Sequence, residues 1–160
     1  MDVNVVTVDQ IYEALSYVHD PEIPALNVLD LGMITGVQVR EGNVLIKMIP
    51  TFAACPAVHF IQKEIREEVE RRLSVQVSVE RDKTIQWNTN RLSEAAYKKL
   101  KQFKIAPPDK NQKELVSGTE CPFCHSHHTY LRSPFGSTLC RALHYCKDCG
   151  QVFEQFKPVE

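Results

Sequence analysis

The sequence predicts an α+β domain, with a small and mostly antiparallel sheet covered by helices, followed by a C-terminal zinc ribbon. Two observations point to this fold class. In the first two thirds of the chain, apolar residues recur at helical spacing, then at alternate positions, then at helical spacing again, which indicates helices and strands in succession. In residues 120–160, two Cys-x-x-Cys pairs stand 21 residues apart, a spacing typical of a zinc ribbon.

The first helix is expected to begin after Thr7. Residues 7–10 have the pattern of a capping box, in which Thr7 accepts an orphan amide hydrogen and Gln10 reaches back to the amide of Thr7. The helix should stop near His19, because Pro21 disfavours helical geometry in the residue before it. A tight loop follows. The apolar stripe of the helix comprises Val8, Ile11, Leu15 and Val18.

A hairpin, a second helix, a third strand and a third helix are expected next. Residues 34–39 and 44–49 form the hairpin around turn residues 41–43, and Ser93 can cap a helix that runs to about Phe103. The predicted order is therefore helix, strand, strand, helix, strand, helix. The apolar residues that mark the second helix and the third strand are Val58, Ile61, Ile65, Val69 and Leu73, and then Val75, Val77 and Val79.

The chain is expected to contain two domains joined by a linker. Its 160 residues, with 43% hydrophobic content, suffice for one ordinary core and a small appendage. The segment between them is rich in proline and polar residues, as linkers are. We therefore expect an α+β domain at residues 1–106, a linker at residues 107–119 and the zinc ribbon at residues 120–160.

Composition disfavours two classes of partner. The formal net charge is only -1, and no stretch concentrates lysine and arginine enough to neutralise many phosphates of a nucleic acid. No segment approaches the roughly eighteen continuous apolar residues that span a bilayer, and the N-terminus lacks the pattern of a signal peptide. We therefore expect a soluble cytoplasmic protein that binds neither nucleic acid nor a membrane.

Four cysteines are the candidate ligands of a structural zinc ion. In a knuckle, two thiolates converge while backbone amides point toward the sulfurs, and two knuckles complete the tetrahedron that Zn(II) prefers. Metal ligation is favoured over disulfides because the sequence shows no export signal. Rubredoxin-like iron and a redox dithiol pair are the alternatives. The candidate ligands are Cys121, Cys124, Cys146 and Cys149.

Five further residues could replace one of these cysteines as a metal ligand. Each also has an ordinary explanation as a surface or packing residue of a ribbon hairpin, so the four-cysteine set is preferred. One of the five is a thiol that is left over once the site is full. The five residues are His125, His127, His128, Cys140 and His144.

Cys55 is a second candidate for chemistry. It follows a strand and precedes Pro56, a residue favoured at the first position of a helix, so its thiol should lie where the helix dipole favours the thiolate. The loop that follows the first helix could bring Asp20 and Glu22 close to it. The alternative is a buried, inert cysteine. His59 is one helical turn further on and is expected to be a packed histidine.

Two groups of short motifs stand out along the chain. The first comprises Asp20-Pro21-Glu22-Ile23-Pro24, Asp30-Leu31-Gly32-Met33, Pro50-Thr51, Cys55-Pro56-Ala57, Trp87 and Ile105-Ala106-Pro107-Pro108. Over residues 7–108 this group closely resembles the SufT-like domain of iron-sulfur assembly factors. The second group comprises Phe135-Gly136-Ser137-Thr138, Cys140-Arg141-Ala142-Leu143 and Phe156-Lys157. With this tail the chain resembles the PaaD family, also called PaaJ, whose members are small subunits encoded with the aerobic phenylacetyl-CoA epoxidase.

The resemblance implies an accessory, non-enzymatic role in bacterial phenylacetate degradation. PaaD-like proteins are thought to help build or insert a metal centre of the epoxidase, either an iron-sulfur cluster or a diiron site, which implies its oxygenase and reductase subunits as partners. The family pattern places the functional thiol at Cys55, where iron or a cluster would be held transiently, with Thr51, Asp20 and Glu22 as neighbours. Asn90 stands where relatives have an acidic residue, so no carboxylate role carries over to that position.

Some of these residues would also suit other functions. A structural adaptor of the oxygenase complex would need the ribbon but not the thiol of Cys55. An enzyme with Cys55 as nucleophile and His59 as base lacks an identifiable third group or oxyanion site. Because clusters usually take about four protein ligands, one cysteine cannot close a cluster site alone. A homodimer that pairs two Cys55 thiols is one arrangement that would supply more ligands.

Overall fold

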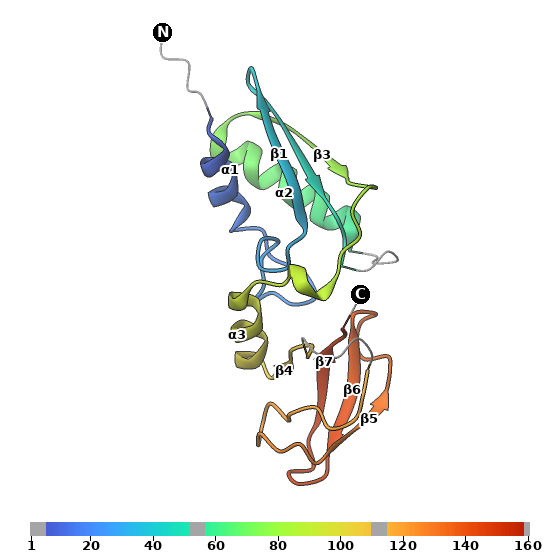
Figure 1. Cartoon of the computed structure of the whole chain (residues 1–160). Coiled ribbons are helices and arrows are strands. Elements are labelled where there is room, and N and C mark those ends of the chain that lie inside the picture. The colour runs from blue at the N-terminus through green and yellow to red at the C-terminus, as the bar shows by residue number, and fades with distance from the viewer. Residues whose placement is uncertain (1–5, 52–56, 110–114, 159–160) are drawn as a thin grey trace. The chain divides into compact units, whose positions relative to one another are not determined.

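The structure is a computed structural model of the chain and describes residues 6–51, 57–109 and 115–158. The chain divides into two compact units, Met1–Gln86 and Trp87–Glu160. Figure 1 labels the helices and strands of both units. Among the described residues, no helix is both long enough and apolar enough to cross a membrane.

The first unit consists of a three-stranded sheet and two helices. Helix α1 (Val8–Leu15) precedes β1 (Ile34–Arg40) and β2 (Asn43–Met48), which form an antiparallel hairpin. Helix α2 (Val58–Leu73) then leads to β3 (Gln76–Arg81), which lies parallel to β2 and gives the strand order β1-β2-β3. A parallel neighbour requires such a crossover connection, whereas the hairpin needs only a short turn. The predicted order of elements and the α+β class are confirmed.

Local sequence signals account for the start of the helices. The Gln10 amide donates to Thr7 Oγ1 at 3.2 Å and the Thr7 amide donates to Gln10 Oε1 at 2.9 Å, so the predicted capping box is confirmed. The Ala96 amide donates to Ser93 Oγ at 3.1 Å, which caps helix α3 (Glu94–Gln102) of the second unit as expected. Each cap satisfies an amide that has no partner within its helix.

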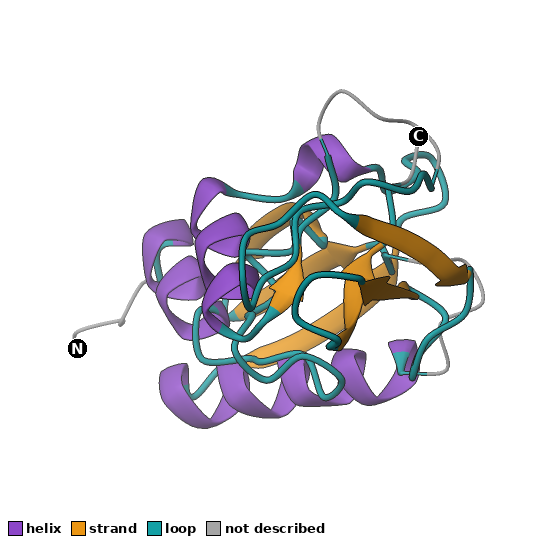
Figure 2. Ribbon diagram, turned by 90° about the horizontal axis from the view of Figure 1, so that it is seen from below, coloured by secondary structure: helices purple, strands orange, loops and turns teal. Residues whose placement is uncertain are grey.

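Helix α2 supplies one side of the core of the first unit. Its buried residues recur every three or four positions, while those of β2 alternate, which are the periods of a helix and a strand that each bury one face. Figure 1 shows α2 running alongside the strands, and it is the long helix at the lower edge of Figure 2. The buried residues are Val58, Ile61, Ile65 and Val69 of α2 and Val44, Ile46 and Met48 of β2.

The second unit contains a four-stranded sheet. A short 3-10 helix, η1 (Thr89–Arg91), and α3 come first, followed by β4 (Ile105–Ala106), β5 (Thr129–Ser133), β6 (Arg141–Cys146) and β7 (Val152–Phe156). The strand order is β4-β7-β6-β5. The pairs β5/β6 and β6/β7 are antiparallel, as in a ribbon, and β4 adds to the edge of β7 in parallel.

Residues 87–106 belong to the same compact unit as the cysteine-rich tail. Strand β4 pairs with β7, and the ring of Trp87 packs against that of Phe156 with their centroids 5.8 Å apart. These contacts join residues that are far apart in the sequence. The boundary at residue 106 and the independence of residues 120–160 remain predictions.

Candidate functional site

The two Cys-x-x-Cys segments fold into the same turn. In the first turn, the amide of His125 donates to the Cys121 carbonyl oxygen at 2.8 Å, and the amide of Cys121 donates to the Ser126 carbonyl oxygen at 2.9 Å. The second turn repeats both bonds between equivalent residues, each at 2.9 Å. The equivalent residues are Gly150, Cys146 and Gln151. Two matched turns therefore present the four cysteines from opposite sides.

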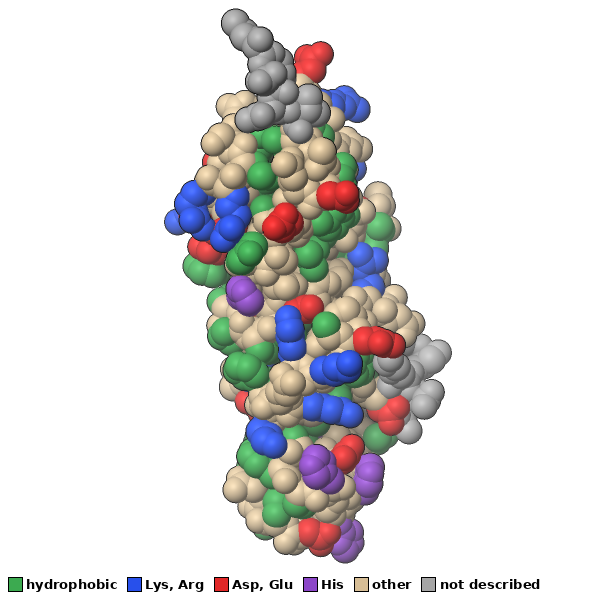
Figure 3. Space-filling view, turned by 90° about the vertical axis from the view of Figure 1, so that its left-hand side faces the viewer, with side chains coloured by type: hydrophobic (Ala, Val, Ile, Leu, Met, Phe, Trp, Pro, Cys, Tyr) green, Lys and Arg blue, Asp and Glu red, His purple; other side chains and the backbone are tan. Residues whose placement is uncertain are grey.

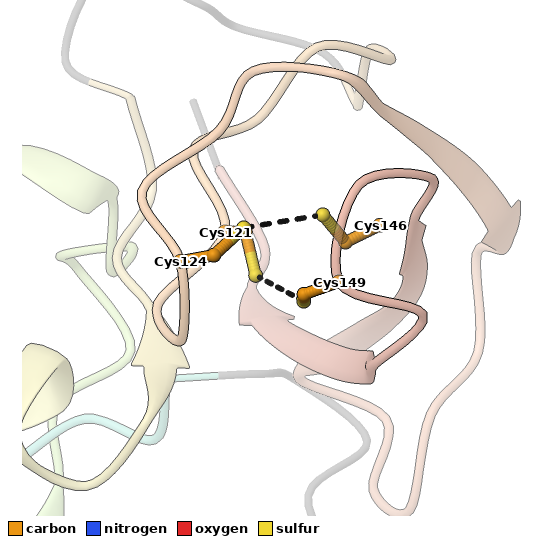
Figure 4. A group of neighbouring side chains, drawn as sticks. All are labelled: Cys121, Cys124, Cys146 and Cys149. Carbon is orange, nitrogen blue, oxygen red and sulfur yellow. Dashed lines mark hydrogen bonds between the residues drawn. The ribbon is translucent and has the colours of Figure 1, made fainter.

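The four sulfur atoms converge on one point (Figure 4). The Sγ atoms of Cys121 and Cys149 are 3.7 Å apart, those of Cys124 and Cys146 are 3.5 Å apart, and all four lie within 4.8 Å of one another. Zinc-thiolate bonds of about 2.3 Å give a tetrahedron with sulfur-sulfur edges of roughly 3.8 Å. The donor set and its dimensions thus fit one tetrahedral metal ion. No donor position is left open for a substrate, which is the property of a structural site.

Burial distinguishes the two cysteines of each pair. Cys121 and Cys146 are fully buried and form a hydrophobic cluster with Ala106 and Phe153, whereas the second cysteine of each pair is exposed. The core of this small unit and the metal-binding cluster therefore share residues. Folding of the ribbon and closure of the cluster should depend on each other.

Backbone amides give the thiols different acidities. Hydrogen bonds from the amides of Cys149 and Asp148 lower the pKa of Cys146 to about 7. The amide of Ser126 lowers the pKa of Cys124, but burial and the neighbouring thiols oppose it and raise the pKa to about 12. Thiols so close together cannot all ionise unless a cation compensates their charge, and a divalent metal ion supplies that compensation.

The exposed histidines beside the knuckles make contacts of their own. Figure 3 shows histidine side chains next to acidic side chains on the surface of this unit. Within the residues that the structure describes, the four cysteines are the only group of three or more His, Cys, Asp or Glu side chains arranged to hold a metal ion. The Nδ1 atoms of His125, His127 and His128 lie 3.1 Å from Glu120 Oε1, 3.0 Å from the Gly118 carbonyl oxygen and 3.3 Å from Asp148 Oδ1.

His144 and Cys140 are buried and lie outside the four-sulfur group. Gln155 Nε2 donates to the Pro107 carbonyl oxygen at 3.3 Å, so its Oε1 atom accepts a hydrogen bond from His144 Nε2 at 2.8 Å. Burial lowers the pKa of His144 and keeps it neutral. Cys140 Sγ lies 3.1 Å from the hydroxyl of Thr138. Both residues therefore have packing roles.

Asp20 braces the loop that follows α1. Its side chain is buried, and Oδ1 accepts hydrogen bonds from the amides of Glu22 at 2.7 Å and Ile23 at 3.0 Å. Such bonds hold a proline-rich turn in one conformation. The structure thus gives Asp20 a local role that the sequence pattern did not reveal, while Glu22 is partly exposed beside it.

The same loop is joined to the end of β2. The amide of Met33 donates to the Val28 carbonyl oxygen at 3.0 Å, and the amide of Ile49 donates to the Met33 carbonyl oxygen at 2.7 Å. Thr51, two residues further on, is buried. The predicted neighbours Asp20, Glu22 and Thr51 therefore belong to connected segments. Cys55 lies outside the described residues, so the distances from its thiol to these groups remain a prediction.

The structure corrects the expectation for His59 and gives Asp30 a local role. His59 is exposed in the first turn of α2, so the expectation of a packed histidine is wrong. Asp30 exchanges hydrogen bonds with Asn27: the Asn27 amide donates to Asp30 Oδ2 at 3.1 Å and the Asp30 amide donates to Asn27 Oδ1 at 2.8 Å. The motif at residues 30–33 is therefore a turn that positions the loop.

Comparisons with known proteins match both parts of the chain. Residues 106–157 match the PaaD zinc beta ribbon domain, and residues 8–80 match a family described as iron-sulfur cluster assembly protein. A protein assigned to the 1,2-phenylacetyl-CoA epoxidase of Escherichia coli as one of its subunits is 39% identical over 155 residues, covering 94% of this chain and 92% of that protein. The Fe-S protein maturation auxiliary factor of Porphyromonas gingivalis is 38% identical over 96 residues, covering 59% of this chain and 90% of that protein.

Solved structures resemble part of this chain in fold. The crystal structure of a DUF59 domain of unknown function from Bacillus anthracis matches with a TM-score of 0.54 and 24% identity, over 57% of this chain and 89% of that one. A conserved hypothetical protein from Thermotoga maritima matches with a TM-score of 0.50 and 27% identity, over 62% of this chain and 98% of that one. Both matches agree with the α+β class.

Proposed function

Because the chain belongs to the PaaD family of phenylacetyl-CoA epoxidase subunits, we propose that it is an accessory maturation factor for the metal centre of the aerobic phenylacetyl-CoA epoxidase. That centre is an iron-sulfur cluster or a diiron site of the oxygenase or reductase subunits. The observation that carries the proposal is the union, in one chain, of a region similar to iron-sulfur assembly proteins with a zinc ribbon. The chain acts in the cytoplasm, handles iron as cargo and catalyses no reaction.

Cys121, Cys124, Cys146 and Cys149 hold a structural zinc ion in this proposal. The four-sulfur donor set, its tetrahedral dimensions and the paired turns favour zinc as the resident ion. Zinc has no redox chemistry, so it stabilises the ribbon without taking part in iron transfer.

Cys55 is the thiol that handles iron or a cluster. It lies within residues 8–80, the region that matches the assembly-protein family. Asp20 holds its own loop in place through Oδ1, and Glu22 and Thr51 supply oxygen atoms in segments connected to that loop. Carboxylate and hydroxyl oxygens beside a thiol suit transient binding of iron, because such a set is too small for permanent retention of a cluster.

The remaining ligands come from outside the chain. Clusters usually take about four protein ligands, so one thiol requires either a second copy or the recipient subunit. A transient homodimer that pairs two Cys55 thiols satisfies this requirement. Direct transfer to the oxygenase or reductase subunit satisfies it as well, and a monomeric mass under assembly conditions would favour that second route.

Coexpression with the epoxidase subunits tests the proposal. The complex is produced with the wild-type chain, with Cys55→Ala or with Cys140→Ala, a matched control that removes a thiol from the other unit. Iron content and epoxidation rate are then measured for the purified complex. We expect Cys55→Ala to leave one subunit short of iron, and Cys140→Ala to behave as wild type.

The same experiment discriminates the second candidate, a structural adaptor of the complex. This alternative is favoured by the relative that is assigned as an epoxidase subunit. If Cys55→Ala leaves iron and rate unchanged while disruption of the ribbon abolishes activity, the adaptor function replaces maturation.

A further inference from the structure

The loop that joins β5 to β6, residues 134–140, is attached to the sheet by one carboxylate. Glu154 of β7 accepts hydrogen bonds from the Ser137 amide at 2.7 Å, from the Ser137 hydroxyl at 2.8 Å and from Arg141 Nη1 at 3.4 Å. The side chains of Arg141 and Glu154 are only 11% and 23% exposed. An ion pair with so little exposure adds little net stability, but it fixes the groups that it joins.

Close packing further restricts this β5–β6 loop. The Gly136 amide donates to the Arg141 carbonyl oxygen at 2.8 Å, and the Lys157 amide donates to the Cys140 carbonyl oxygen at 2.9 Å. A β-carbon at Gly136 would collide with Glu154 Oε2 and press against the Arg141 backbone. A side chain at this position fits only if the Glu154 carboxylate is displaced from its position beside Ser137 or the loop moves. The conformation of the loop is therefore set by the sheet beneath it.

The braced loop presents apolar side chains to solvent. Phe135 is 64% exposed and Leu139 is 43% exposed. Lys157 Nζ lies 4.5 Å from the centroid of the Phe135 ring, which supports one face of that ring. Large apolar side chains on a pre-ordered loop can be buried by a partner with little loss of conformational entropy.

We propose that the exposed side of the β5–β6 loop, formed by Phe135 and Leu139 and not by the buried Cys140, is the surface by which this chain docks onto another subunit of the epoxidase complex. Phe135 and Leu139 enter an apolar pocket of that subunit, because buried aromatic and aliphatic anchors dominate such interfaces. Arg132, which precedes the loop, is exposed, whereas Glu154 neutralises the charge of Arg141. Complementary charge therefore places an acidic side chain at the rim of the partner's pocket, opposite Arg132. This inference rests on the proposed function, since it assigns the partner of that maturation step.

The test measures the affinity of the zinc-loaded, full-length chain for each purified epoxidase subunit by titration calorimetry, without iron. Phe135→Ser and Leu139→Ser should each weaken binding to one subunit by at least about tenfold. Val152→Ser is the matched control, because Val152 is 41% exposed on the same sheet. Val152 pairs with Tyr145 near the knuckles, at the opposite end of β6 from the loop, and its substitution should leave the affinity unchanged.

Gly136→Ala tests the brace separately from the anchors. This variant keeps Phe135 and Leu139 but pushes against the Glu154 carboxylate that attaches the loop to the sheet, so it should weaken the same interaction. Zinc content and circular dichroism of each variant verify that the ribbon remains folded. Unchanged affinity of Gly136→Ala would overturn the role assigned to the brace.

Three outcomes overturn the docking proposal: loop variants that bind like Val152→Ser, a wild-type chain that binds no epoxidase subunit, or loop variants that alter only self-association of this chain. The result is separable from the proposed function, because binding is measured without iron. Cys55→Ala should bind normally in this assay. If loop variants lose binding while epoxidase produced with Cys55→Ala has normal iron content and rate, the docking surface stands and the proposed role of Cys55 in maturation fails.

Discussion

Removal of the metal should unfold the second unit and leave the first unit folded. Half of the hydrophobic cluster at the knuckles consists of the proposed zinc ligands Cys121 and Cys146. A small domain draws only about 3–5 kcal/mol from its core, whereas binding of a structural zinc ion contributes on the order of 10 kcal/mol. The second unit therefore cannot stay folded without the ion. The first unit has a core of its own between α2 and β2.

A single tryptophan makes this loss measurable. Trp87 is the only tryptophan of the chain, is 5% exposed and packs against Phe156. Chelation of zinc should shift its fluorescence emission to the red as the ring enters water. Of the three α-helices, only α3, with nine residues, belongs to the second unit, whereas α1 with eight residues and α2 with sixteen belong to the first. Unfolding of the second unit should therefore remove only about a quarter of the helical circular dichroism signal.

The control for this experiment is Cys140→Ser, which removes a buried thiol that lies outside the four-sulfur group. It should retain one zinc ion per chain and the wild-type response to chelator. If the emission of Trp87 stays unchanged after zinc has been fully removed, the metal does not hold this unit together, and the reasoning from shared core residues is refuted.

Three further predictions concern stability. His125 has a φ of 64° where the equivalent Gly150 has 76°, so His125→Gly should relieve left-handed strain and raise the stability of the zinc-loaded ribbon by about 0.5–1 kcal/mol in urea; a lower midpoint would contradict this. The hydrogen-bonded ion pair with Arg72 lowers the pKa of Glu68 below its usual 4.5 in the folded chain. Ionised Glu68 therefore stabilises the folded state above pH 4.5, and this stabilisation is lost as the pH falls through the lowered pKa. Glu68→Gln should then lower the urea midpoint of unfolding, followed by helical circular dichroism, at neutral pH but not at a pH below the lowered pKa. An equal decrease of the midpoint at both pH values would exclude the ion pair as the cause. Ile65→Ala should cost the first unit about 2–5 kcal/mol, because Ile65 is fully buried, and a loss below that range in urea titration would show that the core repacks.

Features encoded by neighbouring residues were predictable from the sequence. The capping box at Thr7 and the cap at Ser93 depend on contacts three residues apart, and both are confirmed. The two knuckles are equally local, since each closes through hydrogen bonds within six residues. The convergence of the four sulfurs follows from this local geometry and from the β6/β7 pairing that holds the second knuckle.

Features that depend on distant residues were not predictable. Strand β4 has only two residues and pairs with β7, about fifty positions away, so no local period marks it. The attachment of Ser137 to Glu154 across the sheet likewise has no signature in the sequence. The family resemblance places Asp20 beside the functional thiol, whereas the structure shows that its Oδ1 atom braces its own loop, a role that a carboxylate suits equally well and that the sequence does not reveal.

The most direct test of the maturation function is transfer of iron from this chain to an isolated epoxidase subunit. Iron-loaded chain is mixed under anaerobic conditions with the iron-free oxygenase or reductase subunit, and the iron content of the recipient is followed over time after separation. Transfer should occur to one recipient, should fail with Cys55→Ala and should persist with Cys140→Ala. Equal transfer by wild type and Cys55→Ala, or transfer no faster than from free ferrous iron, would contradict the proposed role.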